Sequence, residues 1–197
     1  MTTDMFKGLV RLTFRNPEEA AHLLLSQGWP MSARWMGLLL AVSVSGILAF
    51  VSAQLFPVPE DAEVPTFALS QQPLVLAGFQ LAAIVIGAWL MAGVGRMFGG
   101  HGRFEDALLL AVWIEVILLI VQVVQIVLSL VLPGAAAIMG IIAIALFLWL
   151  TVQFVKALHG FSSGPKILLV MFATLLAMGF IMSFFAASFG LLPEMPQ

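Results

Sequence analysis

The residues whose chemistry could act inside this chain lie on one face of the apolar run 107–132. Glu115 is the ionisable residue of that run, and Gln122, Gln125 and Ser129 follow it at helical spacing. At about 100° per residue, these four side chains fall within a sector roughly 80° wide, while valine, leucine, isoleucine and tryptophan cover the remainder. The sequence therefore predicts one polar stripe, whose carboxylate could serve an ion or a proton.

Lipid restricts where this stripe can lie. A carboxylate in hydrocarbon costs a few kcal/mol, so Glu115 is expected to face other helices or a wet cavity, or to stay protonated. We expect it to be buried against the fourth or the second span and to share polar contacts with Gln122, Gln80 or Gln153, and we expect the fourth span to cover part of the stripe. Two interpretations stay open, because Gln and Ser in membrane helices also hold neighbouring helices together without any further role.

The composition is that of a protein that lies in a bilayer. Of 197 residues, 62% are hydrophobic and 9% are charged, which would leave a soluble domain of this size without enough polar surface. The net charge of −2 and the eight basic residues argue against nucleic acid as a partner. Because cysteine is absent, disulfides, thiolate nucleophiles and Cys-based metal sites are excluded.

Five apolar runs are long enough to cross the ~30 Å hydrocarbon layer as helices. The fold class is therefore expected to be all-α, a polytopic membrane protein with a bundle of five transmembrane helices. The expected transmembrane domain is 35–190 and its spans are 35–56, 73–97, 107–132, 135–158 and 165–189, joined by an acidic, proline-rich connection after the first span and followed by a tail, 191–197. In the first span, small residues recur at every fourth position, which predicts close packing against another span. These are Gly37, Ala41, Ser45, Ala49 and Ala53.

Residues 1–34 are expected to form amphipathic or interfacial helices before the first span. Lys7, Arg11 and Arg15 recur every fourth residue on one side of the first helix, so they are candidate contacts for an anionic membrane surface or a partner. An alternative is that this segment packs on its own membrane domain. Asn16 and Pro17 predict the start of a second helix, with Asn as the N-cap and Pro at the first helical position.

The basic residues predict the orientation of the chain. All eight fall before the first span, between the second and third, or between the fourth and fifth. By the positive-inside rule, the N-terminus is expected in the cytoplasm and the C-terminus across the membrane, in the periplasm or outside. The bilayer itself is the expected partner, with a protein partner or a second copy of the chain as further possibilities.

No motif for catalysis or for a cofactor is apparent. His22, His101 and His159 have no metal-ligand spacing, so we expect separate surface histidines and no metal. The glycine-rich loop 99–102 lacks the strand, lysine and following Ser or Thr of a phosphate-binding loop, so it is expected to be a flexible turn. An intramembrane serine protease would need a histidine at the depth of Ser45, and no predicted span contains one. We therefore expect no enzyme and no cofactor.

Two segments resemble the Yip family, five-span membrane proteins named for their interaction with Ypt/Rab GTPases. Residues 99–108 read GGHGRFEDAL and lead into the third span, and residues 156–166 read KALHGFSSGPK at the exit from the fourth. Asn16-Pro17 before the first span also fits. This chain departs from the family where members carry Tyr and Pro early in the third span, since it has no Tyr and reads WIEV at residues 113–116.

The resemblance implies a non-enzymatic integral membrane protein of a bacterial cytoplasmic (inner) membrane. Its expected role is membrane organisation, as in trafficking, or partner binding. The alternative function is a small transporter or channel that uses the polar stripe of the third span. A transporter is expected to show several polar or broken spans that converge near the midplane, and here only the third span is clearly polar.

Overall fold

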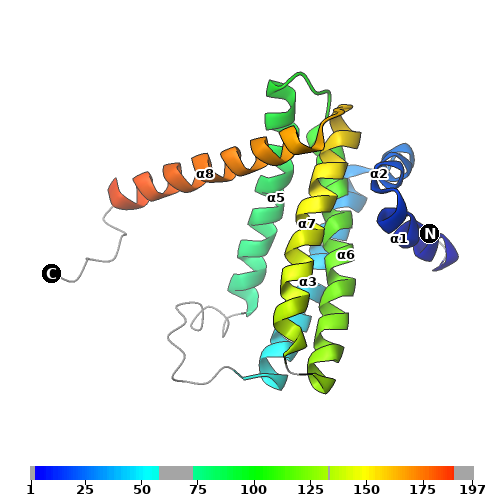
Figure 1. Cartoon of the computed structure of the whole chain (residues 1–197), viewed down its shortest axis with the longest axis vertical. Helices are drawn as coiled ribbons and strands as arrows, with labels where there is room; N and C mark the ends of the chain where they lie inside the picture. The colour runs from blue at the N-terminus through cyan, green and yellow to red at the C-terminus, as the bar shows by residue number, and fades with distance from the viewer. Residues whose placement is uncertain (1–2, 58–72, 133, 189–197) are drawn as a thin grey trace. The chain divides into compact units, whose positions relative to one another are not determined.

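The computed structural model describes residues 3–57, 73–132 and 134–188, and all regular structure in these ranges is helical (Figure 1). The chain divides into two compact units, Met1–Phe161 and Ser162–Gln197, which are described separately. The first unit contains α1 (Thr3–Arg15), α2 (Pro17–Ser26), α3 (Met31–Leu55), α5 (Pro73–Met97), α6 (Phe104–Val131) and α7 (Ala135–His159). The second contains α8 (Gly164–Ser188). The expected acidic connection and the tail after residue 190 lie outside the described residues.

The prediction of five spans is confirmed. Five helices are long and apolar enough to cross a membrane: α3, α5, α6, α7 and α8. Two of them begin earlier than expected, α3 at Met31 and α6 at Phe104. The apolar run marks only the part of a helix that lies in hydrocarbon, whereas the helix continues into the polar interface until a residue such as Pro30, the N-cap of α3, ends it.

Helix α6 is the centre of the first unit. It packs against α3, α5 and α7, and α2 contacts it near its N-terminal end. Leu108, Leu110 and Ile117 of α6 are completely buried. In Figure 1, α3, α5, α6 and α7 run side by side, and α1 and α2 lie beside the upper part of this group. The expected close packing of the small-residue face of α3 is seen in its first half, where Ala41 is buried and Gly37 lies against Val112.

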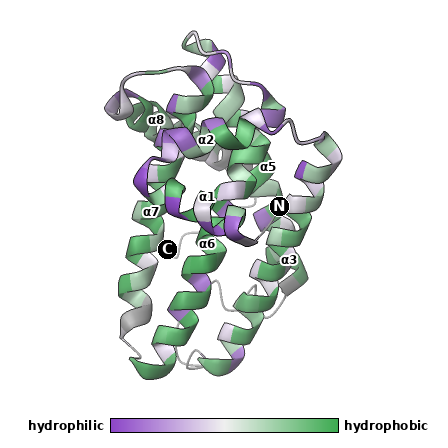
Figure 2. Ribbon diagram, turned by 90° about the vertical axis from the view of Figure 1, so that its right-hand side faces the viewer, coloured by the Kyte–Doolittle hydropathy of each residue, from purple (hydrophilic) through white to green (hydrophobic). Residues whose placement is uncertain are grey.

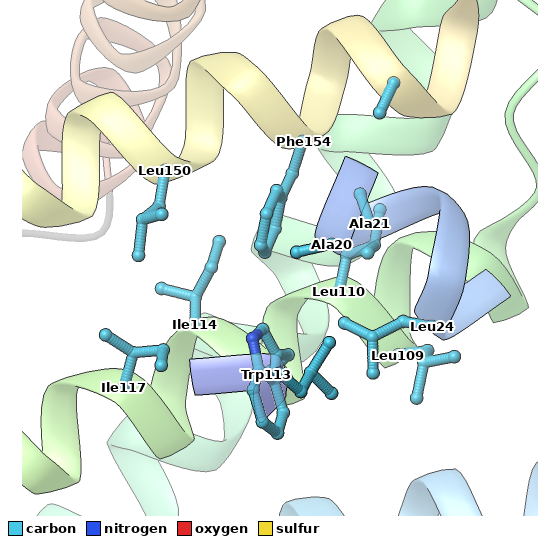
Figure 3. Close-up of a cluster of buried hydrophobic side chains, with 12 residues drawn as sticks. Ala20, Ala21, Leu24, Leu109, Leu110, Trp113, Ile114, Ile117, Leu150 and Phe154 are labelled. Atoms are coloured by element: carbon cyan, nitrogen blue, oxygen red, sulfur yellow. The ribbon is translucent and has the colours of Figure 1, made fainter. Parts of the chain in front are cut away.

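The N-terminal helices pack on the membrane domain. Asn16 caps α2 as expected, since its Oδ1 accepts a hydrogen bond from the backbone N–H of Glu19 at 3.3 Å, and Pro17 is the first helical residue. Figure 3 shows small and aliphatic side chains of α2 against α6 and α7. They form one buried apolar cluster, which includes Leu9, Ala20, Ala21, Leu24, Leu109, Leu110, Trp113, Ile114, Ile117, Leu150 and Phe154.

Helix α7 ends where a glycine, Gly160, follows its last residue. Gly160 adopts the left-handed conformation with φ of 71°, and its backbone N–H returns to the carbonyl of Lys156. A residue with a Cβ is strained in this conformation, so glycine stops the helix here. In the second unit, α8 begins at Gly164, next to Pro165, as the sequence predicts.

Candidate functional site

A polar cluster joins three of the spanning helices. Gln80 of α5 donates from Nε2 to Oε1 of Glu115 on α6, at 2.6 Å, and to Oγ of Ser45 on α3, at 3.1 Å. Glu115 is only 9% exposed. It lies eleven residues after Phe104, about 16 Å along the helix axis, which is well inside an apolar segment of the chain. Ser45, Gln80, Glu115 and Gln122 are called the polar cluster below.

Gln122 completes this cluster from α6. The hydroxyl of Ser45 donates to Oε1 of Gln122, and Nε2 of Gln122 donates to the backbone carbonyl of Ser45, both at 3.4 Å. These distances are long for hydrogen bonds, whereas the bond between Gln80 and Glu115 is short. Gln80 therefore makes the closer contact with the carboxylate, and Gln122 makes a more distant contact with α3.

The structure divides the expected polar stripe into two parts. Glu115 and Gln122 face α3 and α5, whereas Ser129 donates to the backbone carbonyl of Gln125 on its own helix at 2.7 Å. The expected contact between Glu115 and Gln80 is present. Glu115 was expected against the second or the fourth span, and its hydrogen-bond partner Gln80 comes from the second, whereas Gln122 bonds to Ser45 of the first. A short turn between two helices makes them neighbours but does not fix which faces meet.

Ser45 is the member of the cluster that the sequence did not identify. Its position in the small-residue face of α3 indicated packing, and the structure gives it both roles, since it is buried and also bonds to two amide side chains. One feature of the sequence could have found it. Ser45 is the single hydroxyl in that face of otherwise apolar residues, Gly37, Ala41, Ala49 and Ala53.

A cavity of about 300 Å³ lies between α3 and α5 and reaches the polar cluster. Its wall on α3 includes Gly46, Ala49 and Ala53, and its wall on α5 includes Ala77 and Gln80. The small residues of the second half of α3 thus line a cavity instead of packing closely. Gln80 is the polar residue of this lining, so the cavity leads from the ends of α3 and α5 that face the 58–72 connection to the amide that binds Glu115.

Helix α1, which carries the basic residues, is fixed on α6 by buried contacts. Trp113 donates from Nε1 to Oγ1 of Thr13 at 2.9 Å, and Thr13 is completely buried. Phe6 packs edge-to-face on the ring of Trp113, with 5.7 Å between ring centroids. Leu9, one turn before Thr13, is also buried. One face of α1 is therefore fixed on α6.

The opposite face of α1 carries Lys7, Arg11 and Arg15, all of them exposed. Within residues 3–57, 73–132 and 134–188, the ion pairs are Arg34–Asp106, Arg103–Glu105 and Lys156–Glu18, so the three cations of α1 have no carboxylate partner there. Figure 2 shows many hydrophilic positions on α1, on α2 and around the connections at the upper end, whereas the lower parts of α3, α6 and α7 are mostly hydrophobic.

Two of these ion pairs join helices at the same end of the first unit. Arg34 is 8% exposed, donates to Oδ1 of Asp106 at 3.0 Å and also donates to the backbone carbonyl of Trp29. Lys156 of α7 pairs with Glu18 of α2. The first pair joins α3 to α6 and the second joins the N-terminal helices to α7. These contacts place the N-terminal ends of α3 and α6 and the C-terminal end of α7 together.

His159 and the glycine-rich loop form a packed unit at this end, which corrects two expectations. His159 is buried rather than a surface residue; its Nδ1 accepts from the N–H of Gly102 at 3.1 Å, and Nε2 lies 3.0 Å from the carbonyl of Met91. These partners select the neutral ring that carries its proton on Nε2. A Cβ on Gly95 or Gly100 would lie 2.2 Å or 2.1 Å from ring atoms, so the loop is packed around the ring and is not a loose turn.

No three His, Cys, Asp or Glu side chains of the described ranges gather into a set that could hold a metal ion. His22 and His101 are exposed, as expected. The chemistry that the structure does assemble is a buried carboxylate among two amides and a hydroxyl, together with an exposed row of three cations.

Comparison with known proteins gives one match. No curated protein and no solved structure matches the chain. The family model described as the Yip1 domain matches residues 11–185, which run from the last five residues of α1 through four spanning helices and most of the fifth, α8. The match covers nearly the whole chain, and it agrees with the five apolar helices and with the loop and turn motifs at 99–108 and 156–166. This chain is therefore an integral membrane protein that belongs to the Yip1 domain family.

Proposed function

We propose that this protein acts without catalysis as a membrane-organising protein, and that the basic row of α1 is its contact with the acidic headgroups of anionic lipid. The observation that carries this proposal is the outward display of Lys7, Arg11 and Arg15 from a helix whose other face is fixed on α6. The carboxylates that form ion pairs in the first unit already have other cations as partners.

The rigid docking of α1 makes this row a defined surface. Cations four residues apart on a helix lie about 6 Å apart along its axis, so the three charges form a line roughly 12 Å long. Each Lys or Arg near an anionic membrane surface contributes about 1 kcal/mol of attraction. Three such charges on a fixed helix favour a surface that carries several negative charges over a single acidic group.

The neighbours of this row favour lipid as the occupant. Met5 and Phe14 on α1 are 42% and 48% exposed, and Leu23 on α2 is 42% exposed. An amphipathic helix with a basic face and apolar side chains beside it binds at the boundary between headgroups and acyl chains. Because α1 is attached to helices that cross the bilayer, its cations are held beside the same membrane that the protein spans.

The orientation that supports this proposal has the N-terminus in the cytoplasm. All basic residues of the first unit lie on α1 or near the end where Arg34 meets Asp106, which is the side that the positive-inside rule assigns to the cytoplasm. In a bacterial inner membrane, which is the proposed location, α1 then meets the cytoplasmic leaflet.

Lipid co-purification tests this function. The full chain is extracted from its membrane in mild detergent, and the retained lipids are compared by mass spectrometry with the bulk lipids of that membrane. We expect enrichment of anionic lipid for the parent and loss of the enrichment when Lys7, Arg11 and Arg15 are all changed to Gln. The matched control changes Arg96, Arg103 and Lys166 to Gln, removes the same charge from exposed positions and keeps the enrichment.

Two outcomes would overturn the lipid contact. The first is the same lipid composition for both triple variants. The second is crosslinking in native membranes of an acidic protein to α1 that depends on the basic row, which would establish partner binding instead. The polar cluster favours a second candidate, a small transporter; Glu115-dependent flux into liposomes would support it.

A further inference from the structure

We propose that the polar cluster is a binding site for a small monovalent metal cation, with Glu115 as its charged ligand. The argument starts from charge. Glu115 is 9% exposed, and the ion pairs of the described residues all lie near the end where α6 begins. A buried carboxylate without a balancing charge is costly in a bilayer, so this group must either hold a proton or have a cation beside it.

The position of the Gln80 amide shows where that charge fits. Its NH₂ group lies 2.6 Å from Oε1 of Glu115 and 3.1 Å from Oγ of Ser45, so a partly positive group sits between oxygens that belong to two helices. In this structure the NH₂ group stands in for a cation. Rotation of the amide by half a turn about its last side-chain bond would withdraw the NH₂ group and turn Oε1 of Gln80 toward the same point.

Further oxygens lie next to this position. Oε1 of Gln122 lies 3.4 Å from the hydroxyl of Ser45, and the backbone carbonyl of Ser45 accepts from the other end of the Gln122 amide. The available ligands are thus one carboxylate, two amide oxygens, one hydroxyl and one backbone carbonyl. Hard cations bind such oxygen ligands. Because a single carboxylate contributes one negative charge, a monovalent cation leaves the site neutral, whereas a divalent one would leave an excess charge in the bilayer.

The cavity between α3 and α5 gives the site a route of access. It has a volume of about 300 Å³ and is lined by Gln80 at one point and by small residues of α3, such as Gly46 and Ala49, at others. The cavity leads toward the ends of α3 and α5 that adjoin residues 58–72, away from the basic end of the first unit.

This inference is independent of the proposed function, because it concerns α3, α5 and α6 and involves no residue of α1. The experiment uses the purified full chain in detergent, with choline chloride replacing NaCl at constant ionic strength. Thermal unfolding is followed as Na⁺ rises, and bound ²²Na⁺ is measured by equilibrium dialysis. We expect about one bound Na⁺ per chain and a saturable rise of the unfolding temperature, since a ligand that binds the folded state stabilises it.

Variants separate a cation site from a structural cluster. Glu115→Gln keeps the shape and the hydrogen bonding of the side chain but removes its charge, so we expect ²²Na⁺ binding to be lost. Ser45→Ala and Gln122→Leu each remove one neutral ligand and are expected to weaken binding at least tenfold. Ser129→Ala removes a buried hydroxyl that bonds within α6, away from the cluster, and is expected to bind Na⁺ like the parent.

The parent chain decides the proposal even if a variant fails to fold. Absence of saturable ²²Na⁺ binding by the parent would overturn it, and so would unchanged binding by a folded Glu115→Gln variant. A parent whose stability depends on pH but not on Na⁺, K⁺ or Li⁺ would show that Glu115 is balanced by a proton instead, which also overturns the cation site.

Discussion

The hydrogen bond between Trp113 and Thr13 gives the sharpest test of how α1 is docked. Thr13→Val keeps the size of the side chain but removes the oxygen that accepts from Nε1 of Trp113 at 2.9 Å. Thr13 is completely buried and Trp113 is 6% exposed, so water cannot replace the lost acceptor without opening the contact. Leaving a buried donor unsatisfied costs about 1–3 kcal/mol, and we expect the free energy of unfolding to fall by that amount.

A double-mutant cycle isolates this bond from other effects of the substitution. Trp113→Phe removes the donor and leaves an aromatic ring that can still pack against Phe6. In that background Thr13→Val still removes the bond from Oγ1 of Thr13 to the carbonyl of Leu9 but no bond between α1 and α6, so its cost should be smaller than in the parent. The assay is equilibrium unfolding in a denaturing detergent, followed by far-UV circular dichroism, for the parent, the two single variants and the double variant. Equal costs of Thr13→Val in both backgrounds would refute the docking described for α1.

Three further predictions test the end of the molecule where the loops meet. Gly100→Ala is expected to destabilise the protein by about 1–3 kcal/mol in thermal unfolding, because the new Cβ would lie 2.1 Å from Nδ1 of His159. Adding His159→Ala removes the ring atoms at 2.1 and 2.5 Å and leaves only its Cβ, at 2.7 Å, so the double variant should lose less than the sum of the two; additive losses would contradict the packing. Asp106→Asn should cost more stability than Arg34→Met, because Arg34 is 8% exposed and Asp106 is 31% exposed and can be hydrated. Equal unfolding midpoints for these two variants would contradict that difference. Ser162→Cys, in a chain without native cysteine, should react with a membrane-impermeant maleimide from the cytoplasmic side; labelling only from the opposite side would reverse the proposed orientation.

The spans and the family could be predicted from the sequence because both depend on local patterns. A run of about 20 apolar residues is itself the requirement for crossing a bilayer, so the five helices follow from composition along the chain. The predicted boundaries were less accurate where a helix extends beyond hydrocarbon, as α3 does to Met31. Capping residues then predicted the start of α2, with its cap at Asn16, without knowledge of the packing.

The candidate site could be predicted only in part, because its geometry depends on which helix faces meet. Glu115 could be identified because it is the ionisable residue of a long apolar run, and Gln80 was one of its expected neighbours. Which of the expected neighbours reaches the carboxylate is set by the packing of small and large side chains across the helices, and no local pattern encodes it. The polar role of Ser45 depends on Gln80 of α5, which lies beside it only in the folded structure.

The burial of His159 against the glycine-rich loop could not be predicted from the sequence for the same reason. Its burial depends on Gly95, Gly100 and Gly102, which leave room for the imidazole ring from a different part of the chain. In the sequence, a cluster of glycines and a distant histidine each have an ordinary explanation, as a turn and as a surface residue. Only their contact in space, with backbone partners on both ring nitrogens, shows that they form one unit.

The long separation in sequence between α1 and its binding surface has a consequence for biosynthesis. Thr13 and Trp113 are 100 residues apart, and Glu18 and Lys156 are 138 apart. At about 5–20 residues per second, the ribosome needs on the order of ten seconds to make the second partner after the first. The N-terminal helices are therefore made first and docked late. During that interval their apolar residues, such as Leu9 and Leu24, have no protein surface to cover them, and the nearest apolar environment is the membrane into which the later helices are being inserted.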